Sequence, residues 1–161
     1  MPAVRNSICL AALLLLISGC ANDEVILGNF SKATDKRVCA RNFHKSGDIS
    51  SGTYYISHQW FKGTSKKTAV SNLVRYILSL GWSIYNVNTE LGLISAIPQI
   101  TYENNLEASL RVILNVIVTE ERNGLTRVEC TFYATMGQNI SDNDAREELC
   151  NLLEATTQGS D

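Results

Sequence analysis

Five cysteines and two histidines are the side chains of this chain with the greatest capacity for covalent or metal chemistry. Cys20 stands apart from the other cysteines, because it follows a short apolar segment and the small residues Ser18 and Gly19. His44 and His58 lie fourteen residues apart, without the spacing of a zinc site. The sequence therefore predicts neither a metal centre nor a cofactor.

The motifs of the common enzyme classes are missing from the sequence. It holds no Gly-x-Ser-x-Gly, no His-Glu-x-x-His and no phosphate-binding glycine loop. Asp142-Asn143-Asp144 begins like a calcium loop but lacks the glycine and the distal glutamate, so helix capping explains it better. A cell-wall hydrolase is the least favoured class, because Glu120 and Glu121 form no paired motif with a base. We therefore expect a protein that is not an enzyme.

The first twenty residues are typical of an export signal. The apolar run 8–17 follows Arg5 and is too short to span a bilayer. It leads into Ile17-Ser18-Gly19-Cys20, which resembles the lipobox of bacterial lipoprotein precursors: a branched apolar residue, two small residues and a cysteine. An ordinary secretory signal, cut near Gly19 or Ala21, is the alternative.

The lipobox resemblance implies both a covalent modification and a location. Residues 1–19 would be the signal peptide, and Cys20 would carry a diacylglyceryl group and usually an additional N-terminal acyl chain. Two or more acyl chains hold a protein stably on a membrane. Ala21, in place of the aspartate that marks inner-membrane retention, favours the outer membrane, on its periplasmic face or at the cell surface.

The length and composition fit one globular domain. Removal of residues 1–19 from the 161 would leave 142, the size of one domain with a short tether. Apolar residues make up 45% of the sequence and there are two prolines, so the chain can bury a core. We expect a signal peptide over 1–19, a lipidated tether and loosely ordered lead-in over 20–52, and a single domain over 53–161.

The net charge of −2 conceals two segments of opposite sign. Residues 31–68 carry eight basic and two acidic side chains, whereas residues 89–161 carry four basic and twelve acidic ones. The favoured interpretation is a solvated surface whose two halves attract each other within the fold. A basic face that contacts anionic headgroups beside the anchor is the alternative. Nucleic acid is not an expected partner of an exported protein.

The cysteines of the mature chain leave the redox state open. Cys9 would leave with the signal and Cys20 would carry lipid, so Cys39, Cys130 and Cys150 remain. In the oxidising periplasm one disulfide with one leftover thiol is compatible with this count. Cys130 and Cys150 fit equally well as small buried hydrophobic residues. The sequence does not choose a pairing.

The pattern of apolar residues predicts helices packed on a sheet. Residues 53–61 are rich in strand formers, and the ranges 82–88 with 91–100 and 107–119 with 125–136 are typical of two hairpins. A helix is expected after the capping candidates Thr64 and Ser65 and before Gly81, with its apolar stripe at Val70, Leu73, Val74, Ile77 and Leu78. A second helix is expected after Ser141, with its stripe at Ala145, Leu149, Leu152 and Leu153.

These elements predict an α+β fold, with an antiparallel sheet of about five strands and two helices packed on one face. The segment Gly81–Tyr85 and the following Leu91–Ala96 are similar to parts of several small envelope lipoproteins of helix-on-sheet fold, without identifying one family.

Aromatic and basic residues around the first strand are the candidates for partner binding. Core packing is expected for Trp82 and Ile56. The residues expected to contact a partner are Tyr54, Tyr55, Trp60, Lys62, Lys66 and Lys67.

The function expected from this sequence is that of an outer-membrane lipoprotein without enzymatic activity. It would bind a protein partner, as an accessory or structural component of an envelope assembly. The alternative is a carrier of a small apolar or anionic envelope ligand, held between helix and sheet.

Overall fold

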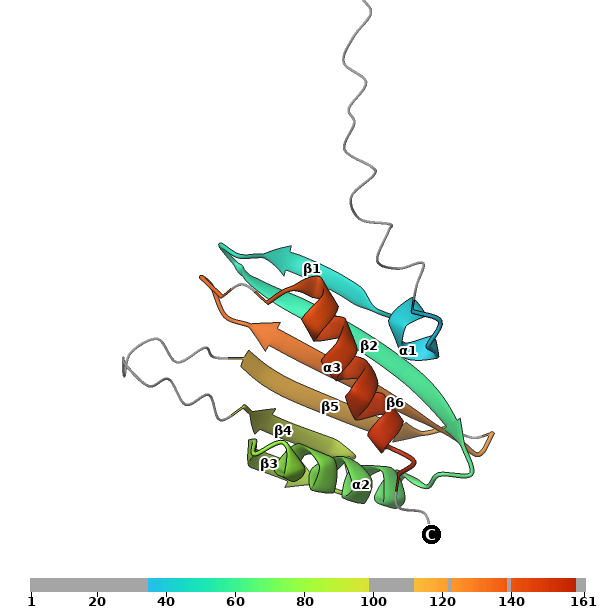
Figure 1. Ribbon diagram of the computed structural model, residues 1–161. Coiled ribbons are helices and arrows are strands. Elements are labelled where there is room, and N and C mark those ends of the chain that lie inside the picture. Colours follow the sequence, from blue (N-terminus) through green and yellow to red (C-terminus); the bar gives the residue numbers. More distant parts are fainter. Residues whose placement is uncertain (1–34, 99–111, 122, 139, 159–161) are drawn as a thin grey trace, which may run out of the picture. The chain divides into compact units, whose positions relative to one another are not determined.

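A six-stranded antiparallel sheet carries three helices in the computed structural model of this protein (Figure 1). The structure describes residues 35–98, 112–121, 123–138 and 140–158. The strands are β1 (His44–Asp48), β2 (Gly52–Lys62), β3 (Ser83–Asn88), β4 (Leu93–Ile97), β5 (Val112–Glu120) and β6 (Leu125–Ala134). The helices are α1 (Val38–Arg41), α2 (Lys66–Ser79) and α3 (Asp142–Ala155). Among the described residues, no helix combines the length and apolar character needed to cross a bilayer.

The predicted α+β class is confirmed, but the sequence predicted fewer strands and helices than the structure contains. The sheet has six strands and not about five, and there are three helices and not two. The additional elements, α1 and β1, lie in the segment 20–52, which was expected to be a loosely ordered lead-in. Every residue of β1 is exposed, so this strand has no apolar alternation by which to recognise it.

The turn between β1 and β2 explains how such a polar segment joins the sheet. The Asp48 carboxylate accepts hydrogen bonds from the backbone N–H groups of Ser50 and Ser51, at 2.8 and 2.9 Å. The hydroxyl of Ser50 donates a further hydrogen bond at 2.7 Å, and that of Ser51 one at 3.0 Å. The Ser50 hydroxyl bond, followed by the other three, lowers the pKa of Asp48 to about 2. Gly47 has a φ of 79°, and a Cβ there would lie 2.3 Å from the Gly52 carbonyl oxygen. The turn therefore depends on local chemistry and not on burial.

The strand order is β1-β2-β6-β5-β4-β3, with every neighbouring pair antiparallel. The two predicted hairpins are present as β3–β4 and β5–β6. The segment that includes α2 connects β2, near one edge of the sheet, with β3 at the other edge. β2 and β6 are therefore neighbours although they are distant in the sequence.

Helix α2 begins and ends close to the predicted positions. The Ser65 hydroxyl accepts a hydrogen bond from the Thr68 N–H at 3.1 Å, which caps the first turn, and Gly81, with a φ of 74°, follows the last turn. Val70, Leu73 and Ile77 are buried as expected. The predicted stripe was too wide, because Leu78 is 56% exposed.

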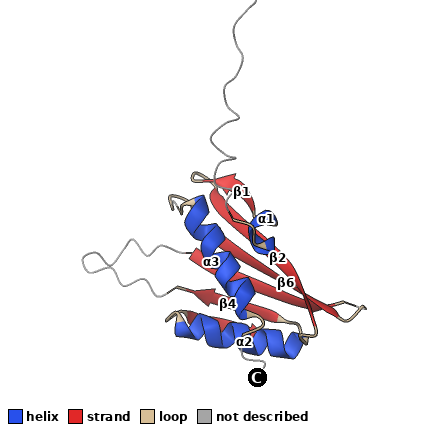
Figure 2. Cartoon of the chain, turned by 45° about the vertical axis from the view of Figure 1, so that its right-hand side comes forward, coloured by secondary structure: helices blue, strands red, loops and turns tan. Residues whose placement is uncertain are grey.

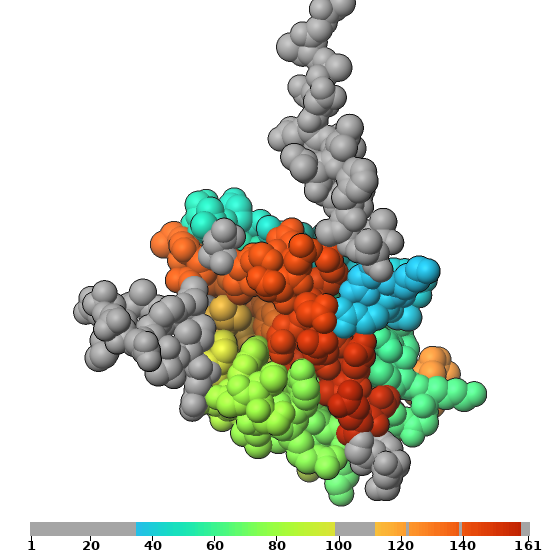
Figure 3. Space-filling model, in the orientation of Figure 1, coloured from blue at the N-terminus to red at the C-terminus, as the bar shows by residue number. Residues whose placement is uncertain are grey.

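The core lies between the helices and one face of the sheet. Figure 2 shows the helices over the strands, and Figure 3 shows α1, α3 and α2 next to one another across that face. α3 contacts β2 and β6, whereas α2 contacts β3, β4 and β5. All four residues of the stripe predicted for α3, Ala145, Leu149, Leu152 and Leu153, are buried. The prediction that both long helices pack on one face is therefore confirmed.

Candidate functional site

The residues predicted to contact a partner are divided between two sides of the domain. Tyr54, Trp60 and Lys62 are exposed and occupy alternate positions of β2, on the face that carries no helix. Lys66 and Lys67 lie instead in the first turn of α2, and the Lys66 Nζ donates a hydrogen bond to the Glu90 carbonyl oxygen at 2.6 Å. The six residues thus do not form one surface.

The prediction for Tyr55 was wrong. Its neighbour Tyr54 faces solvent, so the alternation of β2 turns Tyr55 into the core, where it is 1% exposed. The Tyr55 hydroxyl donates a hydrogen bond to the Ile140 carbonyl oxygen at 2.7 Å. Ile56, which was expected in the core, takes the opposite position and is half-buried on the helix-free face.

The helix-free face of the sheet is the candidate functional site, and we call it the open face. Its residues are the alternate positions of the central strands whose neighbours point into the core. The open face comprises Tyr54, Ile56, His58, Trp60 and Lys62 of β2, Leu125, Arg127, Glu129, Thr131 and Tyr133 of β6, and Ile113, Asn115, Ile117 and Thr119 of β5.

Aromatic pairs and exposed aliphatic side chains give the open face its character. The Tyr54 and Tyr133 rings lie directly opposite each other, with centroids 4.6 Å apart. Trp60 is 46% exposed and meets the His58 ring edge to face, at 4.8 Å. Ile117 on β5 is also exposed. Rigid aromatic rings of this kind contribute large contact areas at protein interfaces.

Two of the three charges on the open face, those of Arg127 and Glu129, compensate each other, and the exposed Lys62 adds a positive charge. The Arg127 guanidinium forms an ion pair with Glu129 and lies 5.7 Å from the centroid of the Trp60 ring. Burial, and then the nearby Arg127, lower the pKa of His58, although Glu129 acts in the opposite direction. His58 is therefore neutral at pH 7. The open face thus presents aromatic rings with a net charge of +1, from Lys62.

Across the described ranges, no three His, Cys, Asp or Glu side chains are grouped so that they could hold a metal ion.

Cys39 and Cys150 form a disulfide, a pairing that the sequence left open. It joins α1 to α3 across 111 residues of sequence, with the two Cα atoms 5.4 Å apart. Cys130 is a free thiol, fully buried in β6, and burial raises its pKa. A thiol in that environment is an inert part of the core.

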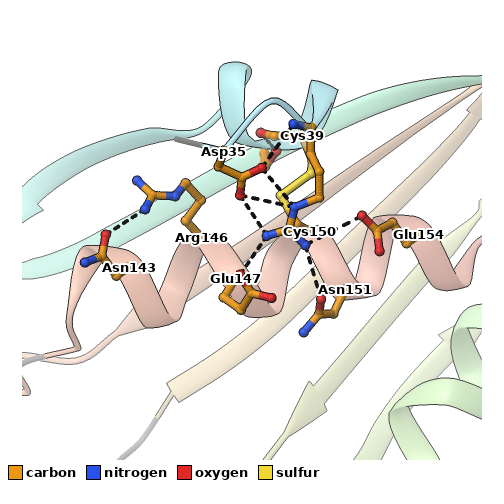
Figure 4. Close-up of polar contacts among 10 residues, drawn as sticks. Asp35, Cys39, Asn143, Arg146, Glu147, Cys150, Asn151 and Glu154 are labelled. Atoms are coloured by element: carbon orange, nitrogen blue, oxygen red, sulfur yellow. Dashed lines mark hydrogen bonds and ion pairs between the residues drawn. A yellow bond between two sulfur atoms is a disulfide. The ribbon is translucent and has the colours of Figure 1, made fainter. Parts of the chain in front are cut away.

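An ion-pair network surrounds the disulfide (Figure 4). The Arg37 guanidinium lies 2.8 Å from the Asp35 carboxylate and 2.7 Å from that of Glu147 on α3. Its Nη1 lies 3.6 Å from Glu154 and donates a hydrogen bond to Asn151 at 3.4 Å. The hydrogen bonds from Arg37 lower the pKa of Asp35. This network and the disulfide hold the beginning of the described chain against α3.

Ion pairs also connect the two oppositely charged segments of the sequence. Arg37 and Lys45, from the basic segment, pair with Glu147 and Asp142 on the acidic helix α3, each at 2.7 Å. This agrees with the favoured interpretation, in which the two halves attract each other within the fold.

Glu148 is the one carboxylate of α3 whose environment is unfavourable to its charge. Its Oε1 is buried without a hydrogen-bond partner among the described residues, and burial followed by the nearby Glu147 raises its pKa. A raised pKa means that the charged form destabilises the fold above that pKa, and that this loss disappears as the pH falls towards 4. We expect Glu148→Gln to raise the melting temperature at pH 7 by a few degrees, with a smaller gain at pH 4.

Glu154→Gln is the matched control for this prediction, because Glu154 lies on the same helix, is exposed and pairs with Arg37. Its melting temperature at pH 7 should not rise. Thermal unfolding followed by circular dichroism measures both variants. A gain for Glu148→Gln that is equal at pH 4 and pH 7 would contradict the assignment of a charge penalty.

Cys20, the predicted lipidation site, lies outside the described residues, as do parts of the predicted strands 91–100 and 107–119.

Arg127, Tyr133 and Ile117 were not predicted to share a surface with Tyr54 and Trp60. The alternation of residues 125–136 indicated part of this surface, because it puts Arg127, Glu129, Thr131 and Tyr133 on one side of the strand. The pairing of β2 with β6 was needed to join them to Tyr54 and Trp60.

Comparison with known proteins identifies no family. No family model matches this chain, and no curated protein matches it either. Among solved structures, it is similar to a conserved protein of unknown function, EF2215, from Enterococcus faecalis. The two are 9% identical with a TM-score of 0.47, over 74% of this chain and 77% of the other.

Proposed function

We propose that this protein is an outer-membrane lipoprotein without enzymatic activity, anchored through Cys20, whose open face binds a protein partner in an envelope assembly. The observation that carries the proposal is the exposed aromatic and aliphatic surface formed by Tyr54, Trp60 and Ile117 on a sheet face that no described helix covers. Exposed apolar surface of this kind, edged by polar side chains, is characteristic of sites of protein contact.

The disulfide supports the exported location in this proposal. A bond between Cys39 and Cys150 persists in oxidising compartments such as the periplasm and is rare in the cytosol. It therefore agrees with the lipobox resemblance, which rests on separate residues.

A carrier of a small ligand has less support. The space between helices and sheet, where a ligand was expected to bind, is occupied by the packed side chains of Val70, Leu73, Ile77 and Phe132, each at most 3% exposed. A hollow near the end of α2, lined by Asn72, Arg75 and Tyr76 among others, lies outside this core cluster. No observation places a ligand there.

Cys20→Ser tests the anchor. Serine has no thiol to receive the diacylglyceryl group, so we expect the variant to lose lipid and to accumulate as uncut precursor or in the wrong compartment. Metabolic labelling with palmitate and fractionation of the envelope measure both effects. Label retained by the Cys20→Ser protein would contradict the lipobox assignment.

The double variant Trp60→Ala/Ile117→Ala tests the open face. The two side chains lie on β2 and β5, on either side of β6, and because both are exposed their truncation removes contact area without touching the core. We expect a partner captured from cross-linked envelopes by the unchanged protein to be lost or reduced at least roughly tenfold, which corresponds to about 1.4 kcal/mol.

Met136→Ala is the control, because Met136 is 71% exposed and follows the end of β6. It should capture the same partner as the unchanged protein. Absence of any reproducible partner, or equal capture by the double variant, would overturn the proposal.

A further inference from the structure

Two residues at the beginning of the described chain are attached to the same side of α3. The Arg37 guanidinium lies 2.7 Å from Glu147 and 3.6 Å from Glu154. Cys39 is joined to Cys150 by the disulfide (Figure 4). Glu147 and Glu154 lie three residues before and four residues after Cys150, and residues at these spacings share one face of a helix. We call Arg37 and Cys39, with these contacts on α3, the α3 clamp.

The α3 clamp is attached to the core of the domain. Cys150 and its neighbour Leu149 are fully buried, and α3 contacts both β2 and β6. These two strands lie next to each other in the sheet, and neither of them is an edge strand. A pull on Cys39 is therefore transmitted through a covalent bond to a helix that is packed on inner strands of the sheet.

β1, which follows the α3 clamp in the sequence, is held less firmly. In the described part of the chain it pairs with β2 alone, and every residue of it is exposed. Lys45 adds an ion pair with Asp142 and a contact with the Tyr55 ring, but both members of the ion pair are exposed, and such pairs contribute little to stability. A pull that reaches β1 can separate it from β2 one residue pair at a time, beginning with His44 and Ile56.

We propose that the α3 clamp bears the mechanical load between the membrane anchor and the domain, and thereby keeps β1 in the sheet when the domain is pulled. The inference rests on the proposed function, because a load arises where Cys20 is held by the membrane and the open face is held by a partner. The order along the chain supports this role. Arg37 and Cys39 come before His44, so a pull from Cys20 reaches α3 before it reaches β1.

Separation of β1 would affect a strand that carries part of the open face. β1 covers the outer side of β2 from Gly52 to Ile56. Tyr54, within this stretch, belongs to the open face. Without β1 the backbone groups of this stretch would be unpaired, and unpaired strand edges associate with other chains. The α3 clamp therefore protects the strand that the proposed partner contacts.

Force spectroscopy on single molecules tests the α3 clamp. The mature chain from Cys20 onwards is prepared without lipid, and one handle is attached to the Cys20 thiol. The second handle is attached to an azide-bearing amino acid in place of Ile117, which is exposed on β5. The force then enters the domain by the same path as a pull from the proposed anchor.

The disulfide should decide how much of the described chain is released before the domain unfolds. With the bond intact only residues 35–38 can be released, which adds at most roughly 15 Å. In Cys39→Ala/Cys150→Ala residues 35–48 can be released, so we expect an additional step of roughly 30–50 Å at a force below that of unfolding.

Two controls separate the path of the load from a general loss of stability. Cys130→Ala removes a buried thiol but keeps the α3 clamp, so it should show no early step above roughly 15 Å. The double variant pulled between positions 62 and 117 should show no early step either, because residues 35–48 then lie outside the path of the load.

A long early step in either control or in the unchanged chain would overturn the proposal, and so would its absence from the double variant pulled from Cys20. The measurement uses protein without lipid, whereas palmitate labelling of the unchanged protein tests the anchor. Failure of the anchor and failure of the α3 clamp are therefore separate results.

Discussion

Replacing Ile77 with aspartate is expected to unfold the domain. Ile77 is fully buried on α2, in the core formed with β3, β4 and β5. Aspartate at this position loses the apolar burial, which contributes about 1.5–3 kcal/mol for an isoleucine side chain. It also buries a carboxylate without a partner, at a further cost of several kcal/mol. The sum is comparable with a typical total stability of about 5–15 kcal/mol. Leu73→Asp, one turn earlier and equally buried, should have the same effect.

Arg75→Asp is the control for both core variants. Arg75 lies on the exposed side of the same helix, and its Nη2 donates a hydrogen bond to the Asn72 Oδ1 at 2.5 Å. Loss of one such bond is expected to cost about 1 kcal/mol, so the variant should remain folded. Circular dichroism during thermal unfolding compares the variants. Equal melting temperatures for Ile77→Asp and Arg75→Asp would show that the buried side of α2 is assigned wrongly.

The two long helices were predictable from the sequence, because capping and apolar spacing are local signals. Ser65 and Ser141 accept hydrogen bonds from the N–H groups three residues later, as their positions before the apolar stripes indicated. The hairpins β3–β4 and β5–β6 were predictable for the same reason, since a short turn connects each pair and the burial of β4, β5 and β6 alternates.

The two elements that the sequence did not predict, α1 and β1, depend on contacts between residues that are distant in the sequence. β1 is polar at every position, and it joins the sheet through backbone pairing with β2 and through Lys45, which contacts Asp142 of α3 and the Tyr55 ring. α1 is a single turn that is attached through the Cys39–Cys150 bond to a helix near the end of the chain. No local pattern carries either contact, and with five cysteines in the chain the sequence does not identify the pair.

The candidate site was predictable only in part, because it also depends on pairing between strands that are distant in the sequence. Residues 53–61 were recognised as a strand from their residue types, but the alternation of its two faces was not applied, so Tyr55 was placed with Tyr54 on the exposed side. Tyr54 and Trp60 do lie on the open face. Their neighbours Tyr133 and Arg127 come from β6, which is adjacent to β2 only because α2 carries the chain across the sheet.

Removal of the disulfide is the second change with a large expected effect. Cys39 and Cys150 enclose almost the whole sheet, with a sequence separation of 111. Closure of a loop of roughly 100 residues in the unfolded chain corresponds to about 4.7 kcal/mol in the chain-entropy model, and measured losses are about 2–5 kcal/mol. We expect Cys39→Ala/Cys150→Ala to lower the urea midpoint accordingly. Reduction of the unchanged protein with dithiothreitol should give the same midpoint, whereas Cys130→Ala, the control, should keep its sensitivity to the reductant.

The loss should affect the whole domain and not only α1, because α1 remains attached after reduction. The Ser57 hydroxyl donates a buried hydrogen bond to the Cys39 carbonyl oxygen at 2.7 Å, and the Asn42 side chain donates one to the His58 carbonyl at 2.9 Å. Arg37 still pairs with Glu147 on α3. Hydrogen exchange of the reduced protein should therefore show faster opening throughout β2, β6 and α3. Faster exchange confined to residues 35–43, with an unchanged urea midpoint, would mean that the disulfide stabilises only the local packing of these residues and not the domain as a whole.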